Sequence, residues 1–207
     1  MNAPMTPIEP MPTWSEEDRA RADHYALLAR LFHSAPDAAL LRALIGSSRA
    51  LGAGDGAFPA AWAALGEAAA HTDAARAADE YAALFLGVGR AEVMINASWY
   101  LAGFLQETPL AELRDDLAEL GLGRRAGVAE TEDHLSALAE VMRHLVLTGP
   151  DEAGLARQRH FFTRHLAPWY GRFVDAVEAQ PAADFYAKAG ALLRAFFDIE
   201  RDAFDML

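Results

Sequence analysis

The residues best suited to chemistry lie in Glu130–Leu135, where three carboxylates and one imidazole occupy five consecutive positions. Apolar residues then recur at helical spacing, so the segment should open a helix that packs into the core, at Leu135, Leu138, Met142 and Leu145. One interpretation has Thr131 as the N-cap, with Glu132 and Asp133 complementing the helix dipole. It leaves His134 unexplained, because a capping box prefers Glu or Gln at that position. A binding role for the cluster therefore stays open beside the capping role.

Other chemistries find little support in the sequence. A carboxylate-bridged di-iron bundle needs paired Glu-x-x-His motifs, and the sequence has none. Lys188 is the only lysine and no phosphate-binding loop is present, which excludes a P-loop nucleotide site. We expect no catalytic residue, no metal and no cofactor. Two alternatives remain: a helical metalloprotein or enzyme that uses Glu130, Asp133 and His134, and a structural adaptor in which the cluster only caps a helix.

Composition predicts an all-α protein. The 207 residues are rich in Ala and Leu and poor in the β-branched residues that strands prefer. A net charge of −12 argues against nucleic acid and favours a basic partner. The absence of cysteine excludes disulfides and thiolate zinc sites. Neither a signal peptide nor a membrane-spanning run is recognisable, so we expect a cytoplasmic protein without membrane insertion.

Capping and stop signals divide the chain into a bundle of about nine to eleven helices with no sheet. Residues 1–13 should form a disordered tail and 14–207 one helical domain, with a possible hinge or subdomain boundary at 121–129. A capping box at Ser15-x-x-Asp18 should start the first helix, and Gly46 should end the second. The last helix should run from Asp184 to Phe204 with Ile199 facing inward.

Three motifs, in this order along the chain, together resemble the TorD/DmsD family of redox-enzyme maturation chaperones. The first is Glu80-Tyr81-x-x-Leu84-Phe85-x-Gly87 with Ser98-Trp99-Tyr100 downstream. The second is the acidic segment Glu130–Leu135, which is similar to the family's Glu-Pro-Glu-Asp-His signature with Thr131 in place of proline. The third is Phe161-x-x-x-His165-Leu166-x-Pro168-Trp169. The family's proline-rich linker is absent between the two parts of the first motif.

The resemblance implies a cofactor-free cytoplasmic chaperone that acts as a monomer or a domain-exchanged dimer. Its partners would be the apo form of a molybdoenzyme catalytic subunit and the twin-arginine signal peptide of that subunit. Residues 101–105 and 109–114 are similar to the subgroup associated with formate dehydrogenase. The residues expected at the peptide site are Tyr81, Leu84, Phe85, Ser98, Tyr100, Glu130, Asp133 and His134.

Overall fold

The computed structural model describes residues 15–51, 54–87, 91–105, 108–125, 127 and 129–207. The predicted tail over 1–13 lies outside these residues. Within them the regular structure is entirely helical, with no strand, which confirms the all-α prediction. The elements are α1 (Glu16–His33), α2 (Ala38–Leu51), α3 (Ala57–His71), α4 (Ala74–Tyr81), the π-helical turn η1 (Ala82–Leu86), α5 (Ala97–Ala102), α6 (Thr108–Glu119), α7 (Leu135–Thr148), α8 (Glu152–His165), α9 (Tyr170–Glu178) and α10 (Phe185–Asp205).

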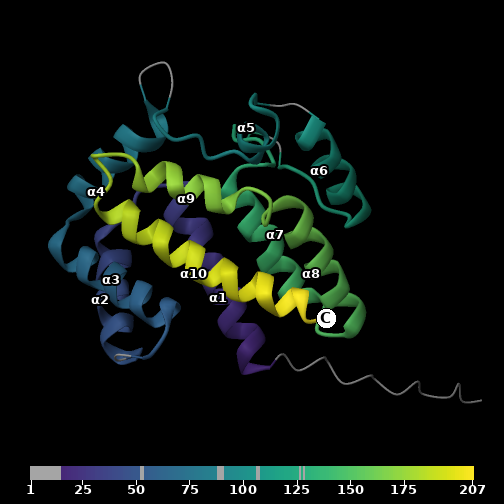
Figure 1. Cartoon of the computed structure of the whole chain (residues 1–207), viewed down its shortest axis with the longest axis horizontal. Coiled ribbons are helices and arrows are strands. Elements are labelled where there is room, and N and C mark those ends of the chain that lie inside the picture. Colours follow the sequence, from purple (N-terminus) through teal and green to yellow (C-terminus); the bar gives the residue numbers. More distant parts are fainter. Residues whose placement is uncertain (1–14, 52–53, 88–90, 106–107, 126, 128) are drawn as a thin grey trace, which may run out of the picture.

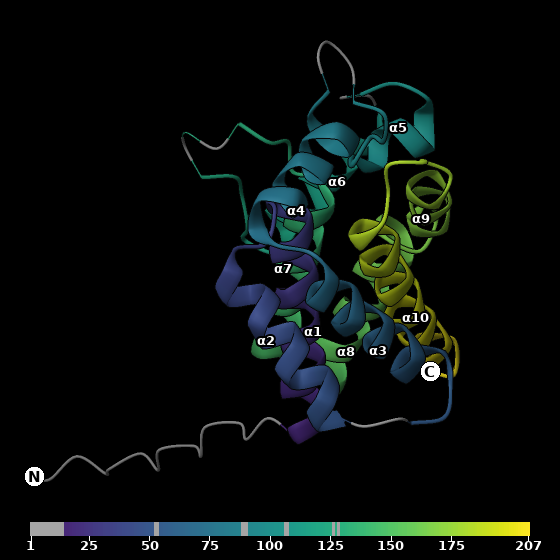
Figure 2. The same cartoon turned by 90° about the vertical axis from the view of Figure 1, so that its left-hand side faces the viewer.

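Two long helices organise the bundle. The first helix, α1, packs along α7, and α10 packs against both α9 and α3 (Figure 1). On the outside, α2 lies against α3 and α8 lies against α7. The start of α1 and the end of α10 lie at the same end of the molecule (Figure 2), whereas α5 and α6 lie at the opposite end. None of the described helices is long and apolar enough to cross a membrane.

Local sequence signals predict some helix ends correctly and others wrongly. The capping box is confirmed, because the Ser15 hydroxyl accepts a bond from the Asp18 N–H while the Asp18 carboxylate accepts one from the Ser15 N–H. The expected end of the second helix at Gly46 is wrong, since α2 continues to Leu51. Packing supplies the reason: Ser48, one half-turn beyond Gly46, lies directly against Gly66 of α3, and this helix–helix contact stabilises the extra turn.

Aromatic side chains fill the centre of the bundle. Five ring contacts, with centroids 5.1–6.3 Å apart, link Phe32, Phe85, Phe173 and Tyr186 and so join α1, η1, α9 and α10. The prediction for the last helix is right in its extent but wrong for Ile199, whose side chain is 51% exposed.

One buried ion pair connects the first helix with the last. The Arg21 guanidinium of α1 donates to both carboxylate oxygens of Glu200 on α10, at 2.7 and 2.8 Å. The Tyr25 hydroxyl donates to the same carboxylate, and Arg21 also donates to the Gln158 side chain of α8. Gln158 in turn donates to the carbonyl of Gly149, just after α7. Four helices therefore depend on a carboxylate that is almost fully buried.

We expect Glu200→Gln to lower the free energy of unfolding by about 2–4 kcal/mol, because it removes the buried carboxylate that pairs with Arg21 and leaves only the longer contact with Asp18, at 3.6 Å. Urea denaturation measures this. Asp202→Asn on the exposed side of the same helix is the matched control and should change stability by less than about 1 kcal/mol. Equal effects of the two variants would show that the buried pair has no special structural weight.

Candidate functional site

The acidic segment is tied to the start of α5 through the carboxylate of Asp133. One Asp133 oxygen accepts from the Ser98 N–H at 3.0 Å and from the Ser98 hydroxyl at 2.6 Å. The other accepts from the Asn96 side-chain amide at 3.1 Å and from the Thr131 hydroxyl. The side chain is buried, at 1% exposure. Both oxygens are thus committed to the protein's own donors, and the carboxylate is closed to a ligand in this conformation.

Backbone bonds reinforce the same junction. The Ala97 N–H donates to the Asp133 carbonyl and the Leu135 N–H donates to the Ile95 carbonyl, which makes an isolated antiparallel bridge between Asn96 and His134. Burial favours the neutral acid and tends to raise the pKa of Asp133, but bonds from Ser98, Thr131 and Asn96 outweigh burial and lower it. A lowered carboxyl pKa means that this stabilisation is present near neutral pH and is lost in acid.

The N-cap of α7 is His134. Its Nδ1 accepts from the Ser136 N–H at 3.2 Å and lies 2.7 Å from the Ser136 hydroxyl, and α7 begins at the next residue. The prediction that Thr131 caps this helix is wrong, because Thr131 lies three residues before the cap and binds Asp133 instead. The histidine that capping did not explain is itself the cap, in its neutral form.

Burial explains the protonation state of this cap. It lowers the pKa of His134 to about 4, against the weaker opposing effect of the Glu130 charge. At neutral pH the ring is therefore uncharged, and Nδ1 remains free to accept the Ser136 bonds. Protonation would convert this acceptor into a donor and remove the cap.

The first motif mainly builds the core. Tyr81, Leu84 and Phe85 are buried, and the Tyr81 hydroxyl donates to the His33 carbonyl at 2.8 Å. The Glu80 carboxylate accepts hydrogen bonds from three N–H groups at the start of α10. No local sequence signal predicts this cap, because the helix that it caps begins about 100 residues downstream.

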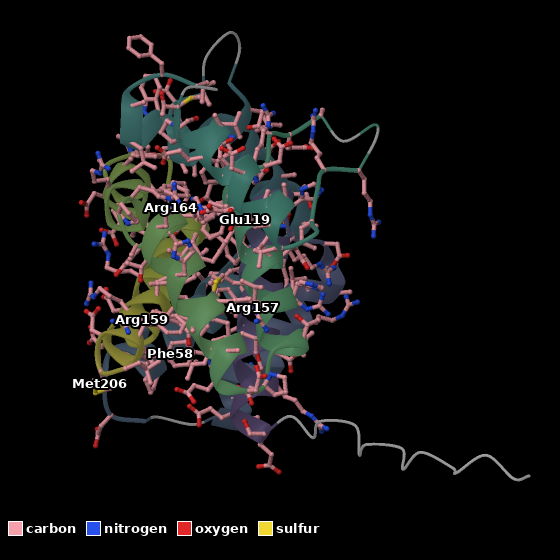
Figure 3. The ribbon with its side chains drawn as sticks, turned by 90° about the vertical axis from the view of Figure 1, so that its right-hand side faces the viewer. Phe58, Glu119, Arg157, Arg159, Arg164 and Met206 are labelled. Atoms are coloured by element: carbon pink, nitrogen blue, oxygen red, sulfur yellow. The ribbon has the colours of Figure 1, made fainter. Side chains whose placement is uncertain are left out.

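The third motif packs against α5 and α6. The Tyr100 ring stacks on Trp169 at 5.4 Å, and the Trp169 indole donates to the His165 carbonyl. His165 Nε2 lies 2.6 Å from a carboxylate oxygen of Asp116 on α6, and Arg164, labelled in Figure 3, donates to the other oxygen at 3.0 Å. The three motifs of the resemblance therefore meet at the junction of α5, α7 and α9.

Of the eight residues expected at a peptide site, only Glu130 is exposed. Tyr100 is half-buried, and the remaining six are buried and bonded or packed within the protein. Contact between these eight residues and a peptide stays a prediction. Among the buried ones, Ser98, Asp133 and His134 join the start of α5 to the start of α7, whereas Tyr81, Leu84 and Phe85 pack in the core.

Glu130 lines a hollow of about 730 Å³ between α1, the end of α6, the segment that joins α6 to α7 (residues 121–129, the connector) and α7. Its floor is apolar and its wall holds carboxylates and guanidinium groups. The apolar lining residues are Ala29, Leu117, Leu122, Ala137 and Val141, and the charged ones are Arg30, Arg124, Arg125, Glu130, Glu132 and Glu140. Sequence spacing could not have found it, because four separate segments form its wall.

The three carboxylates of this hollow differ in what holds them. Glu132 accepts two bonds from Arg114 of α6, at 2.9 and 3.1 Å, and lies 3.6 Å from Arg124 of the connector. Glu140 makes one exposed contact with Arg143, at 3.3 Å. Glu130 has no ion pair or hydrogen bond from its side chain among the described residues, so it is the carboxylate most open to a cationic ligand.

The metalloprotein or enzyme alternative uses Glu130, Asp133 and His134, and two of these three side chains already accept hydrogen bonds within the fold. Both Asp133 oxygens and His134 Nδ1 already serve as acceptors within the fold. Among the described residues no three His, Asp or Glu side chains gather closely enough to hold a metal ion.

Comparisons with known proteins agree with the motifs. The family model described as nitrate reductase delta subunit matches residues 52–175, more than half of the chain. The curated protein "Chaperone protein TorD" of Vibrio cholerae serotype O1 is 26% identical over 138 residues, and the match covers 63% of each chain. The protein of the same name from Vibrio parahaemolyticus is 23% identical over 132 residues, covering 59% of this chain and 61% of that one. The chain thus matches less than two thirds of the length of these relatives.

A solved structure shares the fold over nearly the whole length. It belongs to a proposed redox enzyme maturation protein from Archaeoglobus fulgidus, with a TM-score of 0.57 and 18% sequence identity. The match covers 93% of this chain and 99% of the archaeal one. At this identity the comparison supports the arrangement of helices alone.

We expect Asp133→Asn to lower the free energy of unfolding by about 2–4 kcal/mol, because an amide cannot accept from all the donors that surround it. Chemical denaturation measures this, and Asp115→Asn on the exposed face of α6 is the matched control. Ser98→Ala should lower the free energy of unfolding less in the Asp133→Asn background than in wild type, since both changes remove the same bond. Strictly additive changes in the free energy of unfolding would contradict the bond between Ser98 and Asp133.

Stability should fall between about pH 6.5 and pH 4, because His134 of the unfolded chain is protonated there while the buried cap stays neutral. The loss attributable to this residue is at most about 3 kcal/mol. His134→Asn keeps a capping side chain that does not titrate, so its unfolding free energy should depend less on pH over this range. His134→Ala should be less stable than His134→Asn at neutral pH. Parallel pH profiles for wild type and His134→Asn would contradict the assignment.

Proposed function

Because the chain belongs to the nitrate reductase delta subunit family, which includes the TorD-like chaperones that its motifs resemble, we propose that it is a redox-enzyme maturation chaperone. Its partner is the apo form of a molybdopterin oxidoreductase, and the ligand of the hollow is the twin-arginine signal peptide of that enzyme. The role is non-enzymatic and cytoplasmic. The single observation that carries the peptide proposal is the exposed, unpaired Glu130 at the edge of an apolar hollow.

Charge and shape both suit such a peptide. Its n-region carries consecutive guanidinium groups, which bind carboxylates through paired N–H donors. Its h-region is apolar and matches a floor of Ala, Leu and Val side chains. The net charge of −12 would also raise the rate at which a cationic peptide meets the protein.

The expected site residues then divide into two groups. Glu130, with Glu140 on the next turns of α7, contacts the arginines. Asp133, His134 and Ser98 position Glu130 by fixing the backbone on either side of the Asn96–His134 bridge. Tyr81, Leu84, Phe85 and Tyr100 support that junction from the core and do not touch the peptide in this conformation.

Capture of the client enzyme on tagged protein would identify it. The similarity of residues 101–105 and 109–114 to one subgroup favours a formate dehydrogenase, which should co-purify with tagged protein in its apo form. Recovery of a different molybdenum enzyme would keep the chaperone role and change the client.

We expect Glu130→Gln/Glu140→Gln to weaken binding of a synthetic twin-arginine signal peptide about fivefold to twentyfold, without loss of stability. Fluorescence anisotropy gives the affinity and thermal unfolding gives the stability. The control Glu67→Gln/Asp79→Asn removes two exposed charges from α3 and α4 and should keep affinity within about twofold.

A second peptide with consecutive lysines in place of the arginines separates recognition from attraction by net charge. It should bind wild type more weakly, because an ammonium group does not form the paired contact. Equal affinity of the charge variant and wild type for the arginine peptide would move the site away from Glu130. If neither wild type nor the variants bind the signal peptide, the chaperone would recognise only the mature part of its client.

A further inference from the structure

The connector that lines the hollow contains its own arginine pair. Arg124 and Arg125 are the only two consecutive arginines in the sequence. Both line the hollow beside Glu130 and Glu132, and Arg124 Nε lies 3.6 Å from a Glu132 carboxylate oxygen. The protein thus carries, at the edge of the proposed peptide site, the same chemical group that the site is proposed to bind.

The charge balance of the hollow depends on this pair. Its lining holds three carboxylates, Glu130, Glu132 and Glu140, and three guanidinium groups, of which two belong to the connector. The third, Arg30, has its own partner in Asp37, at 2.9 Å. Without Arg124 and Arg125, the three carboxylates of the lining would keep Arg114 beside Glu132 and Arg143 beside Glu140, and the lining would lose two of its three positive charges. The connector therefore neutralises a site that a cationic peptide would otherwise find attractive.

We propose that Arg124 and Arg125 act as a built-in competitor for the paired arginines of the client peptide. In the free protein Arg124 lies beside Glu132 and Arg125 lines the same hollow, so a client must displace these side chains to bring its own guanidinium groups to the carboxylates. This inference rests on the proposed function and adds a regulatory step to the same site.

The contact is weak enough to be displaced. The side chains of Arg124 and Glu132 are 40% and 12% exposed, and their 3.6 Å separation is long for a charge-assisted hydrogen bond. Glu132 keeps its bonds from Arg114 when Arg124 leaves, so it is not left unpaired. The connector is covalently attached, which gives its arginines a high effective concentration despite the weak contact. Only a ligand that adds contacts of its own, such as those of an apolar h-region, would then compete well.

The test uses the full chain and the same synthetic twin-arginine peptide. Arg124→Gln/Arg125→Gln should bind it about threefold to tenfold more tightly than wild type. The matched control is Arg19→Gln/Arg159→Gln, which removes two exposed arginines from α1 and α8 and so makes the same change in net charge; Figure 3 labels Arg159 on α8. Its affinity should stay within about twofold of wild type. Arg124→Lys/Arg125→Lys keeps the charge and should lie between wild type and the Gln variant.

A competition experiment gives an independent readout. A free peptide with the sequence of residues 121–129 should displace the labelled signal peptide from the Arg124→Gln/Arg125→Gln variant, and the same peptide with both arginines replaced by Gln should not.

Unchanged or weaker binding by the Gln variant, with wild type still binding the signal peptide, would overturn this inference and leave the proposed function intact. An equal gain in the control variant would also overturn it, because net charge alone would then explain the effect. Absence of binding in wild type and in both variants would overturn the proposed peptide site together with it. Binding by the Gln variant alone would support strong competition by the connector.

Discussion

The rest of the site depends on the hydrogen bonds that the Asp133 carboxylate accepts. It collects donors from Ser98 and Asn96 on one segment and from Thr131 on another, at a depth where an unpaired charge would be costly. Satisfying it fixes the start of α5 against the start of α7, and this geometry presents Glu130 to solvent. An acidic segment that looks uniform in sequence therefore divides into one structural carboxylate, one paired carboxylate and one available carboxylate.

Burial of the polar junction also explains why the aromatic motif residues lie where they do. Tyr100 stacks on Trp169, and Tyr81 and Phe85 pack against Tyr186. Asp133 is 1% exposed, so water has little access to the bonds that it accepts. Low water access strengthens each bond to Asp133 and keeps the His134 ring neutral. The apolar core and the polar cap are thus mutually dependent parts of one support, which resembles the supporting shell of a binding site more than the site's surface.

Periodicity and capping rules predicted the helical class, the start of α1 and the extent of α10, because those features depend on neighbouring residues. The rules failed where partners are distant in sequence. Gly46 does not end α2 because α3 packs against the following turn, and His134 replaces Thr131 as the cap because Asp133 takes the threonine hydroxyl. The hollow lay beyond sequence reasoning altogether, since its wall joins α1, α6, the connector and α7.

The proposed chaperone role requires selectivity, because the large negative charge of the chain attracts any basic segment. Local neutralisation offers a physical solution. Long-range attraction depends on the total charge and remains, whereas capture at the hollow requires a ligand to exchange with Arg124 and Arg125. A purely basic peptide gains little from replacing one guanidinium by another. A peptide with adjacent apolar residues gains the burial of those residues in addition, so the exchange would select for the combination of charge and hydrophobicity that defines an export signal.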